Sequence, residues 1–198
     1  MAMITEGSNK NRTRSIKQQA ILESATELLL NKPTATLQEI ADYSGIGIAT
    51  LHRYFSTKEN LLDELALNAI HLVKEAFTRI EYDDEDFEKT LMSIISTLIP
   101  LGNKISFLGT AVSVDENPLV AEGEKQLKAP IISAFDMWKE KGKLNKNISS
   151  HWMVNVIYNL LYFTWQEIQN GNVAKNDAAN LLLTTVLNGF TSQQNQHV

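Results

Sequence analysis

The stretch QEIADYSGIGIATLHRYF, residues 38–55, decides the fold. It carries Ala41 and, four residues later, Gly45. Two helices that cross closely in a helix-turn-helix need a small residue at the crossing. The turn between them needs a left-handed backbone, which glycine adopts most readily. The spacing therefore predicts a pair of short helices. The apolar residues expected to lock this pair are Ile40, Ile46, Leu51 and Phe55.

The second short helix, expected over residues 48–55, has an outward face that suits DNA. Its side chains are small or carry hydroxyl, imidazole, guanidinium and phenol groups, which match base edges and phosphate oxygens. The alternative is an ordinary helical hairpin, in which Ala41 and Gly45 only pack and turn. The candidate DNA contacts on this helix are Ile48, Ala49, Thr50, His52, Arg53 and Tyr54.

Most of the remaining chain has apolar residues three to four positions apart, which predicts an all-α fold of about nine helices. Pro33 ends the first helix, and Thr36 with Glu39 forms a capping box for the second. Ser56 and Glu59 form another capping box, which opens a long helix towards residue 80. The other expected helices cover residues 15–30, 87–99, 105–112, 150–169 and 178–190, and one that residues 115–118 start and that runs to about residue 141.

Charge is distributed unevenly along the 198 residues. The net charge is −5, yet the first 17 residues hold four basic side chains, Lys10, Arg12, Arg14 and Lys17, against one acidic side chain, Glu6. A basic end on an acidic protein suits a chain that touches DNA with that end only. No signal-peptide core and no apolar run of spanning length is recognised, so we expect a cytoplasmic protein.

Catalytic and metal chemistry is not indicated. The chain has no cysteine, which excludes disulfides, thiolate metal sites and cysteine nucleophiles. Its four histidines are scattered, and no phosphate loop, carboxylate pair or metal-ligand spacing is recognised. We therefore expect no enzyme activity, no catalytic residues, no metal and no cofactor. The acidic run at residues 81–86 is interpreted as a solvated connection that favours the start of the next helix, with a cation site as the alternative.

Residues 15–62 resemble the tetracycline-repressor-like (TetR/AcrR) family of transcription regulators. The stretch TLHRYFSTKENLL, residues 50–62, is its most specific part, because an aromatic pair ends the recognition helix and Ser-x-Lys-Glu opens the next helix. The other residues that carry the resemblance are Ile21, Leu22, Ala25, Leu28, Leu29, LQEIA at 37–41, and Gly45.

The resemblance implies a three-helix DNA-binding domain with a basic arm over residues 1–58, whose third helix enters the major groove. By position, Thr36 and Lys58 are expected to meet phosphates, and Arg53 to read guanine. Gly47 stands where the family usually has serine, so that hydroxyl contact is lost although glycine still serves as an N-cap. We also expect the methyl group of a thymine to contact Ile48.

The resemblance assigns ligand binding and dimerisation to residues 59–198. Helix 150–169 is apolar nearly all round, so two sides of it must be covered. The family pattern pairs this helix and the last helix with their copies in a homodimer; a single larger core is the alternative. An aromatic-lined cavity that suits a flat or apolar compound is also expected. The candidate lining residues are Met92, Ile95, Phe107, Phe135, Trp138, Tyr158, Tyr162 and Trp165.

The expected function is that of a repressor which occupies a twofold-symmetric operator in double-stranded DNA and is released by an apolar small-molecule effector. The alternative is an activator, or a regulator controlled by a protein partner without a small-molecule inducer.

Overall fold

The computed structural model describes residues 3–110 and 117–190. Within these ranges it contains nine α-helices, one short 3-10 helix and no strand, which confirms the all-α prediction. Packing divides the chain into two compact units, residues 1–68 and 69–198. This division lies inside the long fourth helix, later than the domain boundary predicted between residues 58 and 59. The functional assignment of the two parts stays a prediction.

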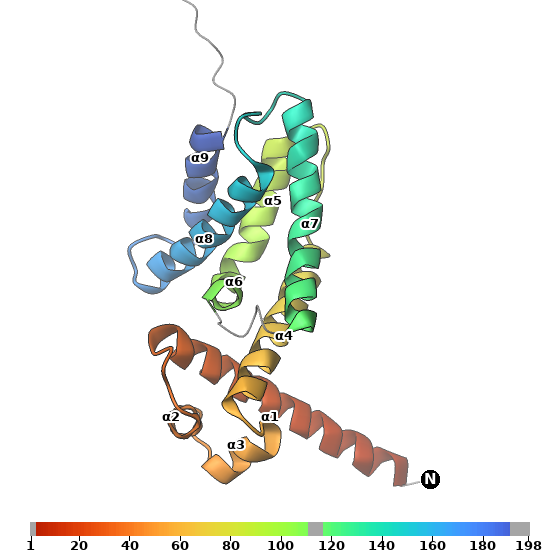
Figure 1. The fold of residues 1–198 in the computed structure, drawn as a ribbon, viewed down its shortest axis with the longest axis vertical. Helices are drawn as coiled ribbons and strands as arrows, with labels where there is room; N and C mark the ends of the chain where they lie inside the picture. The colour runs from red at the N-terminus through yellow and green to blue at the C-terminus, as the bar shows by residue number, and fades with distance from the viewer. Residues whose placement is uncertain (1–2, 111–116, 191–198) are drawn as a thin grey trace, which may run out of the picture. The chain divides into compact units, whose positions relative to one another are not determined.

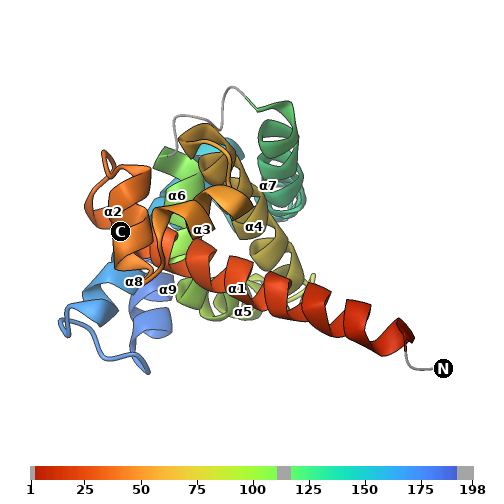
Figure 2. The same ribbon diagram turned by 90° about the horizontal axis from the view of Figure 1, so that it is seen from below.

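The first unit contains α1 (Met3–Asn31), α2 (Leu37–Tyr43), α3 (Ile48–Tyr54) and the beginning of α4 (Lys58–Phe77). The predicted start of α1 at residue 15 was wrong. Its first turns are polar, so they show no apolar periodicity that indicates a helix. Figure 2 shows α1 extending well past α2 and α3, so the basic arm is a continuation of this helix.

The core of the first unit lies beneath the two short helices. Ile40, Leu51 and Phe55 have no exposed surface, as predicted, whereas Ile46 is half-buried. Burying one such large side chain contributes about 1.5–3 kcal/mol. The residues of α1 and α4 that complete this core are Ile21, Leu22, Ala25, Leu29, Leu61 and Leu65.

The predicted capping box at the start of α4 is wrong by one residue. Thr57, not Ser56, caps the helix, because its Oγ1 accepts a hydrogen bond from the Asn60 backbone N–H at 3.1 Å. The Asn60 side-chain oxygen in turn accepts from the Ser56 N–H at 3.3 Å. Asn60, and not Glu59, thus supplies the side chain that bonds back to the backbone before the helix. The helix α4 begins at Lys58.

The second unit contains the end of α4 followed by five more α-helices and the 3-10 helix. In Figure 1, α8 runs obliquely between α7 and α9, and it packs on α6, α7 and α9. The predicted helix over residues 105–112 begins earlier, at Gly102, and its expected end lies outside the described residues. The bounds are α5 (Phe87–Leu98), η1 (Ile99–Leu101), α6 (Gly102–Thr110), α7 (Pro118–Glu140), α8 (Ser150–Gln169) and α9 (Ala178–Phe190).

One apolar stretch in the described part of the chain has the length and composition of a membrane span. Residues Phe87–Leu108 reach a mean hydropathy of 1.4, and 56% of their most apolar window is buried inside the protein. The expectation that no run is long enough was therefore wrong by this criterion. Packing of α5, η1 and α6 into the core of the second unit accounts for the apolar composition.

Candidate DNA interface and effector pocket

The turn between α2 and α3 has the backbone that its sequence predicts. Gly45 lies in the left-handed region with φ +67°. The Ile46 N–H then bonds the Ala41 carbonyl at 3.0 Å, and the Gly45 N–H bonds the Asp42 carbonyl at 3.1 Å, which closes the end of α2. Gly47 has an extended backbone and is the N-cap of α3. The small-residue spacing thus produces the crossing of two short helices.

All nine predicted DNA-contacting residues lie in the first unit, and none of them is buried. Five are exposed: Thr36, Gly47, Ala49, His52 and Arg53. Four are half-buried: Ile48, Thr50, Tyr54 and Lys58. These positions leave every one of the side chains accessible, and their contacts with DNA stay a prediction.

Tyr54 holds two cationic side chains at the end of α3. The Arg53 guanidinium lies 5.6 Å from the centre of the Tyr54 ring, and that of Arg14, on α1, lies 5.9 Å from it. Cation–π attraction of this kind contributes about 0.5–1 kcal/mol at exposed sites. Tyr54 therefore joins the basic part of α1 to α3.

Thr36, which was assigned a phosphate contact, already has partners within the chain. Its Oγ1 accepts from the Glu39 N–H at 3.3 Å and donates to Glu39 Oε2 at 3.1 Å. The same carboxylate accepts from the Thr36 N–H at 2.8 Å and pairs with Lys32. This confirms the capping box. A phosphate that takes the Thr36 hydroxyl must displace the Glu39 carboxylate from it.

The stability of this cap is expected to depend on pH. The bond to Lys32, followed by the bonds from Thr36, lowers the pKa of Glu39 from 4.5 to about 2. A lowered folded-state pKa stabilises the protein fully above about pH 4.5, and this contribution is lost as the pH falls towards 2. We expect urea unfolding of wild type and Glu39→Gln to differ most at neutral pH, with the difference shrinking as the pH falls below 4.5. A difference independent of pH would contradict this account.

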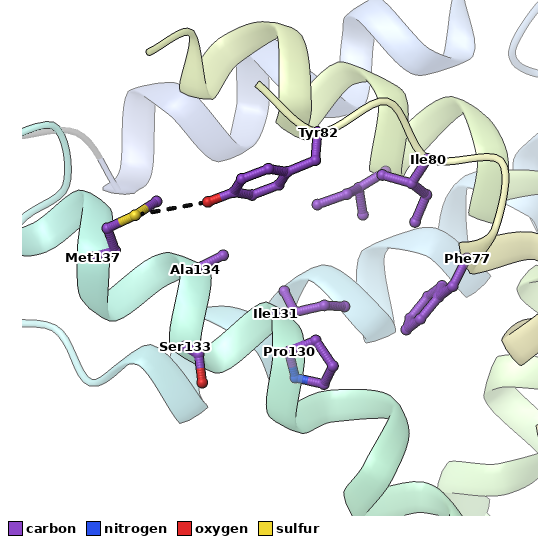
Figure 3. Close-up of a pocket in the computed structure, with 9 residues that line it drawn as sticks. Phe77, Ile80, Tyr82, Pro130, Ile131, Ser133, Ala134 and Met137 are labelled. Carbon is purple, nitrogen blue, oxygen red and sulfur yellow. Dashed lines mark hydrogen bonds between the residues drawn. The ribbon is translucent and has the colours of Figure 1, made fainter. Parts of the chain in front are cut away.

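The second unit has an apolar pocket of about 560 Å³, here called the outer pocket. Figure 3 shows Ile80 and Tyr82 on one wall and residues of α7 on the other. No charged side chain is part of its lining. The lining residues are Phe77, Ile80, Tyr82, Ile94, Pro130, Ile131, Ser133, Ala134 and Met137.

Short side chains of α7 contribute to the lining of the outer pocket. Pro130 and Ala134 lie one helical turn apart on α7, and Pro130 has no N–H for the Gln126 carbonyl, which weakens the helix there. The opposite wall is tied to α5: the Glu81 N–H donates to the Ser93 hydroxyl at 2.8 Å. The small residues of α7 and the segment between α4 and α5 lack the apolar periodicity that identifies core residues. The sequence therefore did not predict them as pocket residues.

Tyr82 lies over the outer pocket. Its side chain is 55% exposed, and its hydroxyl donates to the Met137 sulfur at 3.7 Å. Its ring is stacked on that of Trp138, with a centroid distance of 6.3 Å and an interplanar angle of 19°. A weak bond to sulfur leaves the Tyr82 hydroxyl able to change partners.

The acidic connection next to Tyr82 is ordered by hydrogen bonds. Asp83 accepts from the N–H groups of Glu85 and Asp86, which lowers the pKa of its carboxyl group. Asp86 caps α5 by accepting from the Lys89 N–H at 3.0 Å. Within the described ranges, no three carboxylate or imidazole groups are placed to hold a metal ion.

The eight predicted pocket residues do not line the outer pocket. Phe135 and Tyr158 line a smaller space, here called the inner void, which is too small to admit water. Ile94 and Ile131 border both spaces. Of the other six candidates, Ile95, Phe107 and Trp138 are buried, and Met92, Tyr162 and Trp165 are half-buried. Their contact with a ligand stays a prediction.

A face of α8 and α9 exposes large apolar side chains among amides and hydroxyls. Trp152 is 62% exposed, Phe163 is 54% exposed and Leu181 is 54% exposed. The polar residues exposed on the same two helices include Asn155, Asn159, Thr184, Thr185 and Asn188. Together these eight residues are called the α8/α9 face. Exposed apolar side chains in such a group are typical of interaction surfaces.

The family model described as bacterial regulatory proteins, tetR family, matches residues 21–65. The N-terminal part of the chain therefore matches the TetR family. The matched TetR-family segment runs from within α1 through α2 and α3 into α4, so it covers the helix-turn-helix and its supports.

Two HTH-type transcription regulators are similar in sequence to this chain. The HTH-type transcriptional repressor LfrR of Mycolicibacterium smegmatis is 29% identical over 118 residues, which are 60% of this chain and 62% of LfrR. The match therefore spans less than two thirds of that repressor. The HTH-type transcriptional regulator NfxB of Pseudomonas aeruginosa is 21% identical over 174 residues, 87% of this chain and 93% of NfxB.

Solved TetR-family structures share the fold. LfrR from Mycobacterium smegmatis in complex with proflavine has a TM-score of 0.67 at 22% identity, covering 89% of this chain and 98% of LfrR. A TetR-family regulator from Marinobacter aquaeolei has a TM-score of 0.69 at 18% identity, covering 92% of this chain and 100% of that regulator. At these identities the likeness shows the fold alone.

Proposed function

We propose that the protein is a repressor that occupies a twofold-symmetric DNA operator as a homodimer and is released by an apolar small molecule. The observation that carries this proposal is the accessible end of α3, where Tyr54 gathers Arg14 and Arg53. Cations and a phenol at the end of a short exposed helix suit the major groove and its phosphates. The relative LfrR is a repressor, which supports repression rather than activation for this protein.

In this proposal five accessible residues of the first unit have a role on DNA. The Arg53 guanidinium reads O6 and N7 of a guanine, as its two parallel donors allow. Lys58 and Arg14 neutralise phosphates, and Ile48 packs on a thymine methyl group. Thr36 contributes its hydroxyl after Glu39 releases it.

Selection of bound sequences from a random duplex library tests the DNA-binding proposal. We expect enrichment of a twofold-symmetric site, a steep fall of affinity with rising salt, and loss of binding in Tyr54→Ala. If wild-type protein enriches no sequence above non-specific binding even at low salt, the proposal is wrong.

The proposed homodimer forms through the α8/α9 face. Two recognition helices must lie roughly 34 Å apart to read both halves of a symmetric site, so a regulator of this kind works as a dimer. The α8/α9 face supplies two large aromatic side chains and Leu181, which suit the centre of an interface. The surrounding amides and hydroxyls suit its hydrogen bonds.

The double substitution Trp152→Asp and Phe163→Asp is expected to convert the dimer to a monomer at micromolar concentration, because four unpaired carboxylates would then face one another. Sedimentation velocity measures the change, and operator affinity falls with it. Leu119→Asp is the control, because Leu119 is 70% exposed but lies on α7, outside the α8/α9 face. A double variant that remains a dimer would place the interface elsewhere.

Release by an apolar effector is supported by the outer pocket, whose volume of about 560 Å³ lies in the range of ligand sites. The related LfrR has been crystallised with proflavine, and we extend small-molecule binding from it to this chain. Phe77, in the outer pocket, is the last residue of α4, the helix that starts at Lys58. A ligand that favours one position of α4 can therefore change operator affinity by differential binding to two states.

A further inference from the structure

We propose that the effector is a flat, uncharged aromatic compound with one hydrogen-bond acceptor, which enters the outer pocket, passes between Ile94 and Ile131, and accepts a hydrogen bond from Tyr158. This inference rests on the proposed function, because it names the ligand class to which the second unit responds. It places the effector at a site that includes two of the predicted aromatic contacts, Phe135 and Tyr158, at its inner end.

The Tyr158 hydroxyl is a buried donor without an acceptor. The residue is 9% exposed, and its hydroxyl has no hydrogen-bond partner anywhere in residues 3–110 or 117–190. The inner void beside it is too small for water, so solvent does not satisfy it either. An unpaired buried hydroxyl is costly, and such groups in native proteins are rare enough to indicate a partner that arrives later.

The Tyr158 hydroxyl stays a donor under all physiological conditions. Burial, with a smaller contribution from the Glu124 carboxylate, raises the pKa of this phenol above its ordinary value of 10.0. The Lys128 ammonium, paired with Glu124, lies 5.5 Å from the centre of the Tyr158 ring. The matching ligand group is therefore an acceptor such as a carbonyl oxygen.

The outer pocket and the inner void share two isoleucines in their linings. Ile94 and Ile131 border both spaces, and each is an aliphatic side chain with alternative rotamers. We expect a change of rotamer at Ile131 to join the spaces without breaking a hydrogen bond, since its side chain has no polar atom. The shared wall therefore gives a route from solvent to Tyr158.

The lining excludes charge and favours flat rings. Since none of the lining residues is charged, an ion in the outer pocket loses its hydration without gaining a partner. Tyr82 and Phe77 offer ring faces or edges at the mouth, where aromatic contacts add to the burial of apolar surface. These properties favour an uncharged polycyclic ketone over a charged dye.

Fluorenone and fluorene are suitable probes, because they have the same tricyclic shape and differ by one carbonyl group. We expect calorimetry on the full-length wild type to show fluorenone binding about tenfold more tightly than fluorene. Tyr158→Phe is expected to remove this difference while leaving fluorene binding unchanged. It is also expected to keep or raise the melting temperature, since it removes an unpaired hydroxyl.

Ala134→Trp, which fills the outer pocket, is expected to abolish binding of both probes. Ala121→Trp is the matched control, because Ala121 is exposed on the same helix and does not line the outer pocket. Proflavine, a cation at neutral pH, is expected to bind at least tenfold more weakly than fluorenone.

Equal affinities for fluorenone and fluorene, no fluorenone binding, or an unchanged preference in Tyr158→Phe would each overturn the inference. Stronger binding of proflavine would overturn the assignment of an uncharged ligand. Operator binding without effector is measured on the same preparations. A protein that binds operator but not fluorenone refutes this inference alone, whereas a protein that binds no operator refutes the proposed function.

Discussion

Replacing Arg53 by alanine is expected to weaken binding to the selected operator at least tenfold, because each of two recognition helices would lose a guanine contact. A bidentate contact of this kind discriminates by about 1–3 kcal/mol. Arg53 is exposed, so its removal leaves the core of the first unit intact. Fluorescence anisotropy with labelled operator measures the loss, and an unchanged melting temperature shows that folding is not responsible.

Two further variants separate base recognition from charge. Arg53→Lys keeps the positive charge but loses the planar pair of donors. If Arg53 reads a base, the operator affinity of Arg53→Lys is expected to fall as far as that of Arg53→Ala. Wild-type affinity in Arg53→Lys would instead assign Arg53 to a phosphate. Arg79→Ala is the matched control, since Arg79 is also exposed but lies in the second unit.

Gly102→Ala is expected to destabilise the protein by about 1–3 kcal/mol, the usual effect of overpacking. A Cβ atom at Gly102 would lie 2.5 Å from the Cβ of Trp165 and 2.8 Å from the Leu161 carbonyl oxygen. Both atoms belong to the backbone of α8 or are attached directly to it, so α6 and α8 must move apart. Thermal unfolding followed by circular dichroism measures the loss.

Gly123→Ala provides the contrast within the same unit. Its nearest neighbour would be the terminal methyl group of Ile70 at 2.7 Å, which can turn away. Alanine is also preferred to glycine inside a helix by about 1 kcal/mol, so we expect little change or a small gain in stability. Equal losses in the two variants would show that close approach of α6 to α8 is not the reason for glycine at position 102.

The helical elements were largely predictable because their signals are local. Ala41 and Gly45 predicted the crossing and the left-handed turn, and Thr36 with Glu39 predicted the cap of α2. The bounds of α8, Ser150–Gln169, agree with the apolar pattern. Each of these features depends on residues within a few positions of one another, which is the range over which spacing is informative.

The outer pocket and the beginning of α1 were not predictable in the same way. A pocket is space that side chains leave unfilled, and Pro130 and Ala134 contribute to it by being small. Tyr82 reaches it from a connecting segment without helical periodicity. The first turns of α1 carry no apolar stripe, so their helix is invisible to a hydrophobic pattern. An unfilled space and a helix without an apolar stripe produce no periodic pattern, so a single sequence does not indicate them.

In the proposed dimer, the amides on the α8/α9 face are expected to limit which subunits can assemble with one another. Asn155, Asn159 and Asn188 each bring donors and acceptors to a surface whose apolar centre is Trp152 and Phe163. A copy of the same chain presents matching groups, whereas a related regulator with other side chains leaves buried amides unpaired at about 1–3 kcal/mol each. Subunits of different regulators that share this fold are therefore expected not to mix in the same cell.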